Sequence, residues 1–406
     1  MKVVKLSIII FLILLNTINA QEKTTCGGTR AEGSYNLSGI KSSVTIPFEL
    51  VGNLVVLPLE INNVKTRFIL DTGMPMMGGL FTNFGKAATL NFDYSGEAQV
   101  GGAGGGASRA KIASGVKFKI GDLEFNNQTI VVMPESKNLS FFETDGVIGG
   151  EILTRFIVDI NYDDQLITLT KPENYKFPKD AEEIQLPFES NYPFIKCSAI
   201  MESGEIIPLN MVLDLGASHN LSLVLGSQEK IVLPKKSLKV STGRGVTKEI
   251  FGFTGRIKNF KIGPFSFDNP LVTFNESKLM PFEKEGNLGS GIMRRFNITF
   301  DYPNRRIFIK PNKSFLNSFE FNMAGIQYSK SRDGRIVIDN ILPNSSGSEA
   351  GLEVEDVLIK INNVNTNDIS RNDLKNIFEK ENEVVVLTIK RGETIKTISV
   401  KLRRII

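Results

Sequence analysis

The stretch FILDTG at residues 68–73 returns as MVLDLG at residues 211–216, 143 residues later. Two further stretches repeat in the same order: KIGDLEFNN (119–127) as KIGPFSFDN (261–269), and GVIGGEILTRFIVDINY (146–162) as GNLGSGIMRRFNITFDY (286–302). The offsets of these two pairs are 142 and 140 residues, so the frame is almost constant. Two copies at this spacing predict two similar lobes, because solenoid repeats are shorter and number three or more.

The residues around these repeats favour β structure. Short apolar runs such as NLVVLPLEI, TRFILD and RIFIK are rich in β-branched and aromatic residues and are bounded by Gly, Pro, Asn and Asp. Helical periodicity is scarce between residues 40 and 315. We therefore expect two β lobes, lobe 1 over residues 36–180 and lobe 2 over residues 181–315.

The composition excludes several classes of site. The 406 residues contain one histidine, His219, and two cysteines, which rules out multi-histidine and four-cysteine metal centres, iron–sulfur clusters and disulfide-stapled scaffolds. Lysine and arginine number 48 against 44 acidic residues, and the net charge of +4 gives no overall attraction to nucleic acid. Catalysis would rest on carboxylates, hydroxyls or backbone amides, so we expect no metal and no cofactor.

The N-terminus has the layout of a secretory signal peptide. In residues 1–20, two lysines precede an apolar run that is about half the roughly 20 residues of a membrane span. We expect cleavage after Ala20 rather than an uncleaved anchor, followed by a short lead over residues 21–35. The protein would then be secreted or periplasmic without stable membrane insertion. A Cys26–Cys197 disulfide is permitted there, but the sequence alone cannot establish it.

Asp71 and Asp214 occupy the same place in the two copies. Each follows an apolar strand and precedes a turn with glycine two residues on, Gly73 and Gly216. If a pseudo-two-fold axis relates the lobes, these turns face each other. Two carboxylates about 3 Å apart cannot both ionise, so they share a proton. One member can then take a proton from water while the other donates to a carbonyl oxygen; the pair titrates as a unit, so neither role is assigned.

These motifs resemble those of aspartic proteases, in a secreted bacterial two-copy form related to pepsin and the retroviral proteases. The resemblance covers most of residues 40–315 and includes the strands at 146–150 and 287–290, which resemble the apolar-apolar-Gly strand behind each catalytic turn. It implies a mainly β, bilobal, pepsin-like fold with Asp71 and Asp214 as the catalytic residues. The residues that it implies for the support of the two turns are Thr72, Gly73, Gly216, Ala217 and Ser218.

Glycine-rich segments follow each aspartate by about 30 residues, GGAGGG at 101–106 and STGRG at 241–245. They stand where the family has a flap that closes over a polypeptide substrate, and glycine gives a β loop the required mobility. The flap residues implied by the resemblance are Gly101, Gly102, Gly104, Gly105, Gly243 and Gly245.

The second motif departs from the family at Leu215. The family has threonine or serine there, and its hydroxyl hydrogen-bonds across to the opposite turn. Thr72 can make its half of that contact and Leu215 cannot, so we expect a less firmly held pair. Met74 and Ala217 likewise offer no hydroxyl to the aspartates, and such a bond would favour ionisation. We therefore expect an activity optimum nearer neutral than gastric pH.

Three other residues have plainer interpretations. His219 follows Ser218 directly, and adjacent residues rarely face each other, so a catalytic histidine is not expected. Arg155 and Arg295 hold matching repeat positions, which indicates a common structural role such as an ion pair or a carbonyl contact.

Residues 320–406 form a separate αβ module that resembles a PDZ domain. Ala-Gly-Ile-Gln at 324–327 stands where the family has its carboxylate-binding loop, and residues 368–380 would form the helix beside the peptide groove. The resemblance implies that the backbone N–H groups of Gly325, Ile326 and Gln327 accept a peptide C-terminus. Alternatively, the module packs on the lobes as a regulatory cap and binds no free peptide. Glu355 replaces a glycine that is usual in the family.

The function favoured by the sequence is an aspartic endopeptidase with a PDZ domain for peptide recognition or regulation. The alternative is a peptide-binding pseudo-protease, in which Asp71 and Asp214 are ordinary turn residues. Leu215 favours this alternative, whereas the presence of both aspartates favours the enzyme. The oligomeric state cannot be read from the sequence.

Overall fold

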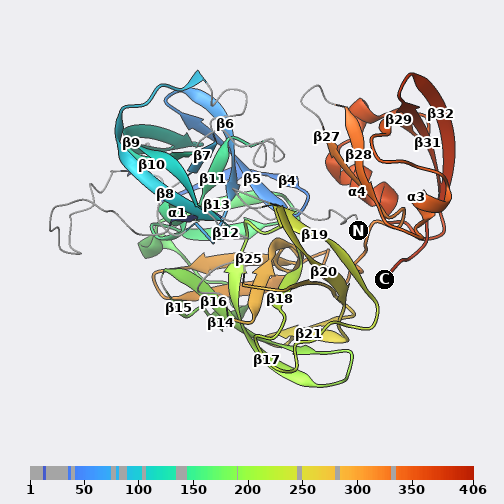
Figure 1. The fold of residues 1–406 in the computed structure, drawn as a ribbon. Helices are drawn as coiled ribbons and strands as arrows, with labels where there is room; N and C mark the ends of the chain where they lie inside the picture. Colours follow the sequence, from blue (N-terminus) through green and yellow to red (C-terminus); the bar gives the residue numbers. More distant parts are fainter. Residues whose placement is uncertain are drawn as a thin grey trace.

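The computed structural model describes residues 12–14, 35–37, 42–74, 79–81, 89–102, 107–133, 144–189, 191–244, 249–278, 284–330 and 335–406. Figure 1 shows two β lobes, lobe 1 above lobe 2, with the C-terminal module in orange and red beside them. The predicted mainly β, bilobal architecture with an αβ C-terminal module is confirmed.

Lobe 1 is built on one twisted sheet. Its strands are β1 (Leu12–Leu14), β2 (Tyr35–Leu37), β4 (Glu49–Val51), β5 (Leu54–Ile61), β6 (Val64–Leu70), β7 (Gly79–Phe81), β8 (Tyr94–Gly102), β9 (Ala107–Ile120), β10 (Leu123–Met133) and β11 (Gly146–Ile148). The strand order is β1-β8-β9-β10-β7-β11-β6-β5-β4, with β2 paired to β10. The helix α1 (Gly150–Leu153) follows β11.

Lobe 2 repeats this plan. Its strands are β15 (Phe188–Glu189), β16 (Tyr192–Ile200), β17 (Ile206–Asp214), β18 (Leu221–Val224), β19 (Ser237–Arg244), β20 (Glu249–Arg256), β21 (Asn259–Ile262), β22 (Phe265–Asp268), β23 (Leu271–Asn275) and β24 (Gly286–Gly289). The parallel pair β17–β24 corresponds to the parallel pair β6–β11 of lobe 1. The helix α2 (Ser290–Met293) follows β24 as α1 follows β11.

A third sheet joins the two lobes. Its order is β14-β26-β25-β12-β13-β3. Its strands are β3 (Ser43–Pro47), β12 (Ile157–Asn161), β13 (Leu166–Thr170), β14 (Glu182–Gln185), β25 (Phe296–Asp301) and β26 (Arg306–Pro311), and the short helix η3 (Pro172–Asn174) follows β13. The repeat-equivalent strands β12 and β25 pair with each other, and the register is centred on Asp159 opposite Thr299. This symmetric register is the predicted pseudo-two-fold relation between the lobes.

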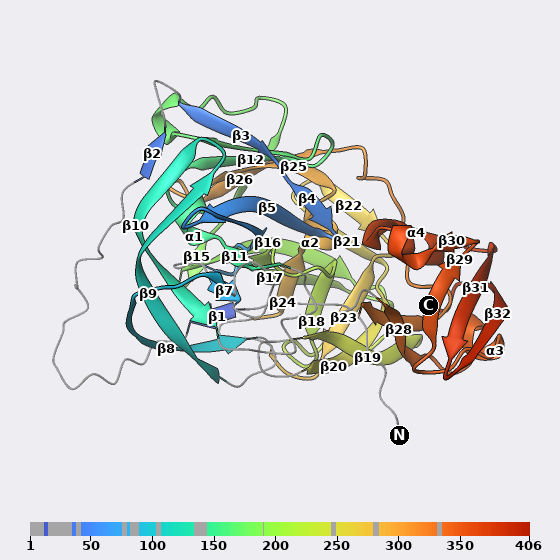
Figure 2. The ribbon, with the colours of Figure 1, turned by 90° about the horizontal axis from the view of Figure 1, so that it is seen from above.

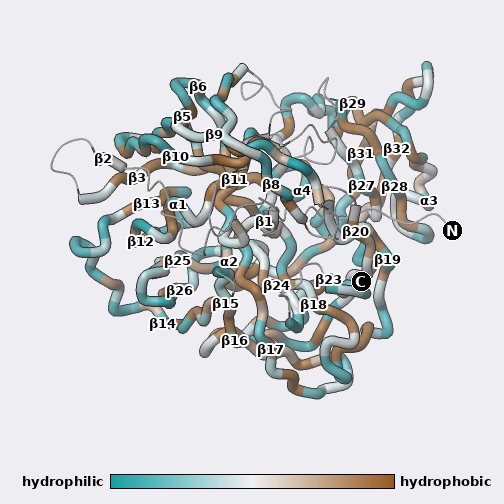
Figure 3. The backbone as a smooth tube through the Cα atoms, turned by 60° about the vertical axis from the view of Figure 1, so that its left-hand side comes forward, coloured by the Kyte–Doolittle hydropathy of each residue, from teal (hydrophilic) through white to brown (hydrophobic). Residues whose placement is uncertain are grey.

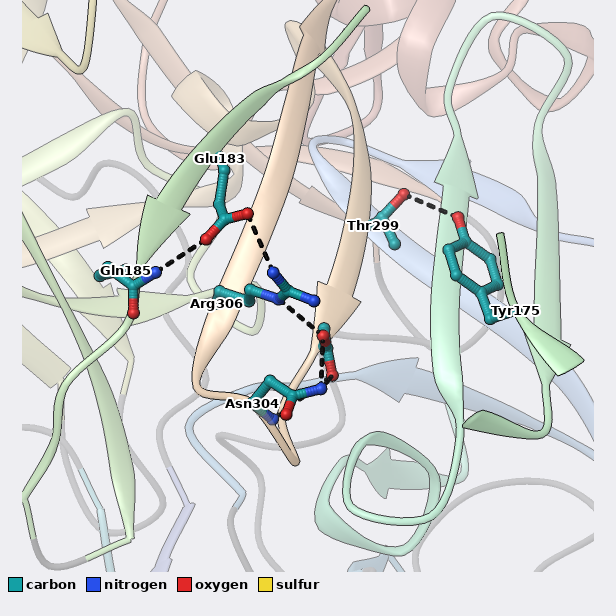
Figure 4. Close-up of polar contacts among 7 residues, drawn as sticks. Tyr175, Glu183, Gln185, Thr299, Asn304 and Arg306 are labelled. Carbon is teal, nitrogen blue, oxygen red and sulfur yellow. Dashed lines mark hydrogen bonds and ion pairs between the residues drawn. The ribbon is translucent and has the colours of Figure 1, made fainter. Parts of the chain in front are cut away.

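Polar contacts fasten the lobe 2 side of this joining sheet (Figure 4). Arg306 bridges Asp301 at 2.8 Å and Glu183 at 3.0 Å. Near the two-fold centre, the Tyr175 hydroxyl lies 3.2 Å from the Thr299 hydroxyl. The Thr299 hydroxyl also donates to Asp159 across the axis at 2.6 Å.

The lobes share one hydrophobic core. Alternating burial along β3 and β9 shows the half-buried strand pattern expected from alternating apolar residues. The largest buried side chains are phenylalanines from both lobes, including Phe125, Phe156, Phe260 and Phe296. Figure 3 shows brown hydrophobic stretches along the strands, with teal at many outer turns. One continuous core holds the two lobes in a fixed relation, which the site between them requires.

The C-terminal module has a core of its own. Its elements are β27 (Ile326–Lys330), β28 (Ile336–Ile341), α3 (Ser346–Glu349), β29 (Val357–Ile361), β30 (Val364–Asn365), η4 (Thr366–Asp368), α4 (Arg371–Phe378), β31 (Val384–Arg391) and β32 (Thr394–Lys401). The predicted helix is α4, and Ser370 caps its N-terminus by accepting from the Asp373 N–H. Glu355 has φ +76°, so this residue adopts the left-handed conformation that the usual glycine would allow without strain.

The module packs against both lobes. Figure 2 shows α4 on the side of the module that faces the lobes. The Asn372 side chain at the start of α4 donates to the Leu50 carbonyl at 2.6 Å and accepts from the Gly52 N–H at 3.1 Å. A second contact is apolar: Phe321, Leu342 and Ile406 of the module pack on Val240 of lobe 2.

The N-terminal predictions fall mostly outside the described residues. Strand β1 lies within the predicted leader 1–20 and pairs with β8. Among the described residues, no helix is both long and apolar enough to cross a membrane. Cys197 forms no disulfide with another described residue, and Cys26 lies outside the described residues, so the Cys26–Cys197 disulfide stays a prediction.

Candidate active site

The structure brings Asp71 and Asp214 together. Asp71 directly follows β6 and Asp214 ends β17, and the two side chains are 1% and 0% exposed. A Cβ atom built on Gly73 would lie 3.0 Å from Asp71 Oδ1 and 3.5 Å from Asp214 Cγ. A Cβ on Gly216 would lie 2.4 Å from Asp71 Cγ. Both glycines are therefore required by the close approach of the carboxyls, as the turn motif predicts.

One strand per lobe passes behind each turn. The Asp71 N–H donates to the Ile148 carbonyl of β11 at 2.9 Å. In lobe 2, β24 runs parallel to β17 with Gly289 opposite Asp214. A Cβ on Gly149 would lie 2.0 Å from the Asp71 carbonyl oxygen, and one on Gly289 would lie 2.3 Å from the His219 carbonyl oxygen. Only glycine lets these strands approach the turns so closely.

The contact across the turns is one-sided. The Thr72 hydroxyl donates to the Leu213 carbonyl at 2.7 Å and accepts from the Leu215 N–H at 2.9 Å. The Leu215 side chain is fully buried and returns no hydroxyl. Instead, the Ser290 hydroxyl at the start of α2 donates to the Leu215 carbonyl at 2.6 Å. The second turn is thus stabilised from within its own lobe.

The remaining turn residues form hydrogen bonds through their backbone atoms and give no side-chain hydrogen bond to the two carboxylates. Met74 and Ala217 are buried and carry no hydroxyl, as the sequence indicates. The Ala217 carbonyl accepts from the Ser290 N–H at 2.8 Å. The Ser218 carbonyl accepts from the Asn53 side chain of lobe 1 at 2.5 Å. Ala217 and Ser218 therefore connect the second turn to its surroundings.

One contact at the dyad was missed by the sequence reasoning. The Asn287 side-chain amide on β24 donates to Asp214 Oδ2 at 3.0 Å. The available signal was in the repeat itself. When GNLGS is aligned with GVIGG, Asn287 takes the position that the apolar Val147 holds in the first copy. The matched position in lobe 1 therefore offers no such donor.

Burial dominates the electrostatics of the pair. It raises the pKa of Asp71, while hydrogen bonds from the Gly73 N–H, at 2.7 Å, and from Asp214 act in the opposite direction. Burial also raises the pKa of Asp214, and the charge of Asp71 adds to this effect. Among the described residues, Asp71 Oδ2 and Asp214 Oδ1 have no hydrogen-bond partner of good geometry. Two buried carboxyls in this relation oppose ionisation of both at once, because each negative charge raises the pKa of the other group.

Comparisons with known proteins identify the two parts of the chain. Residues 57–152, which contain β6, Asp71 and β11, match the family model described as aspartyl protease. Residues 318–390 match the model described as PDZ domain. The chain contains an aspartyl protease domain and a C-terminal PDZ domain. Among solved structures, an aspartic proteinase from Irpex lacteus is similar at 12% identity and a TM-score of 0.44, over 68% of this chain and 99% of that chain. No curated protein matches the chain.

Three of the six predicted flap glycines lie in the described part of the chain, at or near strand ends. Gly101 and Gly102 end β8, and Gly243 lies near the end of β19 after a register shift against β20. Gly104, Gly105 and Gly245 lie outside the described residues. The flap role stays a prediction for all of these glycines.

In the PDZ domain, Gly325 has φ +68°, and a Cβ there would lie 2.2 Å from Ser345 Cβ. Its N–H donates to the Asn322 carbonyl at 3.0 Å, and the Ala324 N–H donates to the Asn322 side chain at 3.0 Å. Two N–H groups of the predicted carboxylate-binding loop are therefore engaged inside the domain. Ile326 and Gln327 begin β27, and the Gln327 side chain accepts from Asn340 at 3.3 Å.

Three further sequence interpretations meet the structure as follows. His219 is buried, and burial lowers its pKa to about 4, so it is neutral near pH 7. Arg295 donates to carbonyls, one of the roles expected for both matched arginines, whereas Arg155 donates to the Gln128 side chain at 3.2 Å, so these hydrogen bonds differ between the two copies. Within the described ranges, no group of three or more His, Cys, Asp and Glu side chains is arranged to hold a metal ion.

Proposed function

We propose that the protein is an aspartic endopeptidase that uses Asp71 and Asp214 as its catalytic dyad. The observation that carries this proposal is that the two buried carboxyls meet at two-fold-related turns. A Cβ atom built on Gly73 would lie 3.0 Å from Asp71 Oδ1 and 3.5 Å from Asp214 Cγ. The aspartyl protease match over residues 57–152 supports it. The raised pKa of both carboxyls supports an activity optimum nearer neutral than gastric pH.

The dyad would act by general acid–base hydrolysis. The ionised carboxyl takes a proton from a water molecule as the water oxygen attacks the peptide carbonyl carbon. The protonated carboxyl gives its proton to the carbonyl oxygen, which yields a neutral tetrahedral diol. The C–N bond then breaks as the newly protonated carboxyl gives its proton to the amine nitrogen and the other carboxylate takes a proton from a diol hydroxyl. This step yields a carboxylic acid and an amine, and it leaves the dyad singly protonated. The pair titrates as a unit, so the two roles belong to the dyad rather than to one residue.

The other domain would bind peptide or regulate access. The PDZ match supports recognition of a peptide C-terminus, with the N–H groups of Ile326 and Gln327 as the proposed donors, because the Gly325 N–H already donates to the Asn322 carbonyl. The packing of α4 on residues 50–52 supports a regulatory contribution, because the groove-flanking helix also contacts the protease domain.

A second candidate is a peptide-binding pseudo-protease. The buried apolar Leu215 favours it, since the second turn lacks the hydroxyl that would complete the contact between turns. The engaged loop N–H groups of the PDZ domain neither favour nor oppose cleavage. The two candidates differ in one measurable property, the hydrolysis of peptide bonds.

The deciding experiment compares the wild type with Asp71→Asn and Asp214→Asn on a mixed peptide library between pH 3 and pH 8, with cleavage products read by mass spectrometry. We expect cleavage by the wild type that falls by about a thousandfold or more in each variant. A transition-state-type aspartic protease inhibitor should block the wild-type activity. Equal rates in wild type and variants would reject the enzyme, and peptide binding without cleavage would establish the pseudo-protease.

Export is also a proposal. We infer removal of residues 1–20 and a secreted or periplasmic location from the leader pattern alone. N-terminal sequencing of the mature chain tests this, since an N-terminus at Gln21 is expected.

A further inference from the structure

Asn287 lies directly behind the catalytic turn of lobe 2. It is fully buried on β24, opposite Val212 of β17 on one side and Ser222 of β18 on the other. Its Nδ2 atom donates to Asp214 Oδ2 at 3.0 Å. It therefore reaches the dyad from the protein interior.

The lobe 1 copy is a natural comparison. The matched residue there is Val147, buried on β11 opposite Ile69 of β6 and Gly79 of β7. The same strand position is thus apolar behind Asp71 and polar behind Asp214. Burying an amide costs free energy unless the amide is hydrogen-bonded, so packing alone does not account for Asn287.

We propose that Asn287 is a positioning residue of the dyad, which holds the Asp214 carboxyl from behind the turn and supplies the donor that Ala217 cannot. This inference rests on the proposed function. The amide fixes the orientation of Asp214 Oδ2. It also stabilises the ionised carboxylate, because a hydrogen-bond donor interacts more strongly with a charged acceptor.

The effect of Asn287 on the titration of Asp214 must be separated from the effects of the ionisable groups near Asp214. Asp71 is its coupled partner in the dyad. The His219 ring lies with Nε2 3.4 Å from the Asn287 carbonyl oxygen, and burial keeps it neutral near pH 7. Burial raises the pKa of the Tyr192 and Tyr302 phenols, and the charges of both aspartates raise it further. Among these described groups, only the dyad changes its charge in the neutral range, so its titration reports on Asn287.

Two variants and one control test the proposal in the full chain. Asn287→Val copies the lobe 1 residue, and Asn287→Leu removes the amide at similar volume. The control is Thr254→Val, which removes a buried hydroxyl from the same sheet. That hydroxyl donates to the Val272 carbonyl at 3.2 Å and makes no contact with the dyad. The readouts are the pH dependence of kcat and a ¹³C NMR titration of the Asp214 carboxyl, assigned by comparison with Asp214→Asn.

We expect both Asn287 variants to shift the acid limb of kcat, and the NMR midpoint, upward by about one pH unit. The value of kcat below neutral pH should fall by about tenfold with KM little changed, because Asn287 does not touch substrate. Thr254→Val should show neither effect.

Two outcomes would overturn the proposal. The first is an unchanged titration and an unchanged kcat in both Asn287 variants. The second is a loss of folded protein in both of them but not in Thr254→Val, which would assign Asn287 a purely structural role. Failure of the proposed function is distinguished by the wild type: a chain that cleaves no peptide rejects the enzyme, while the NMR titration still decides whether Asn287 acts on Asp214.

Discussion

The Thr72 side chain hydrogen-bonds to the backbone on both sides of Asp214, and Leu215 has no hydroxyl to form the reciprocal hydrogen bond to the first turn. The Thr72 hydroxyl donates to the Leu213 carbonyl at 2.7 Å and accepts from the Leu215 N–H at 2.9 Å. Ser290 supplies the Leu215 carbonyl with a partner from lobe 2 itself. The cross-lobe hydrogen bonds of this contact therefore depend on a single side chain, whereas the family arrangement uses two.

Replacing Thr72 by valine should weaken both fold and catalysis. The change keeps the shape but leaves the Leu213 carbonyl and the Leu215 N–H buried without this partner, at about 1–3 kcal/mol for each group. We expect the free energy of unfolding to fall by about 2–6 kcal/mol. We also expect kcat to fall by at least about tenfold, since the turns set the spacing of the dyad. Urea unfolding and peptide cleavage measure the two effects.

Thr66→Val is the matched control for this prediction. Thr66 lies on the same strand β6, is buried, and its hydroxyl donates to the Leu59 carbonyl at 3.0 Å within lobe 1. It should lower stability with little change in kcat. If the two valine variants lost stability and activity in the same proportion, the cross-lobe contact of Thr72 would have no special part in catalysis.

The site could be predicted where the sequence repeats. The matched FILDTG and MVLDLG stretches located both aspartates, and the symmetric pairing of Asp159 opposite Thr299 is the physical form of that repeat. Contacts that differ between the copies were less visible. Asn287 stands at an otherwise apolar strand position, and only three-dimensional packing shows that its amide points at Asp214.

Contacts between segments far apart in the chain could not be predicted at all. Asn372 reaches Leu50 and Gly52 across more than 300 residues, and no local pattern marks that pairing. Glu355 was visible as a departure from glycine, but its positive φ appears only in the fold. Sequence periodicity reports which face of a strand is buried, and it carries no information about which distant surface covers it.

The buried dyad should make stability depend on pH. Burial raises the folded pKa of Asp71 above its ordinary value of 3.8. Below that value both folded and unfolded states are protonated, so the group has no effect. As the pH rises, the unfolded chain ionises first, and the native state loses stability until the folded carboxyl ionises as well. Asp71→Asn removes this loss, so the variant should gain about 1–3 kcal/mol over the wild type between pH 4 and pH 7.

The measurement is urea unfolding of both proteins at the two pH values. Asp93→Asn, on an exposed segment before β8, is the control and should leave the pH dependence of stability unchanged. An equal difference between Asp71→Asn and wild type at pH 4 and pH 7 would show that the Asp71 carboxyl titrates alike in folded and unfolded chains.

Arg295 should set how firmly the PDZ domain is attached. Its guanidinium donates to the carbonyls of Phe315 at 3.1 Å and Ser318 at 3.1 Å, also contacts those of Ser314 and Asn317, and lies 3.8 Å from the Phe319 ring centroid. These contacts of the Arg295 side chain therefore hold in place the segment that leads into the PDZ domain. Arg295→Lys keeps the charge but loses the planar fork that reaches several carbonyls at once.

We expect Arg295→Lys to speed limited proteolysis within residues 314–319, where Leu316 is already 90% exposed, by about tenfold at unchanged overall fold. The repeat supplies the control, because Arg155 at the matched position of lobe 1 bonds the Gln128 side chain and lies over the Phe125 ring. Arg155→Lys should leave cleavage in this segment unchanged. Mass spectrometry of the fragments locates the cut, and equal cleavage of the two variants would show that the guanidinium of Arg295 does not hold the segment.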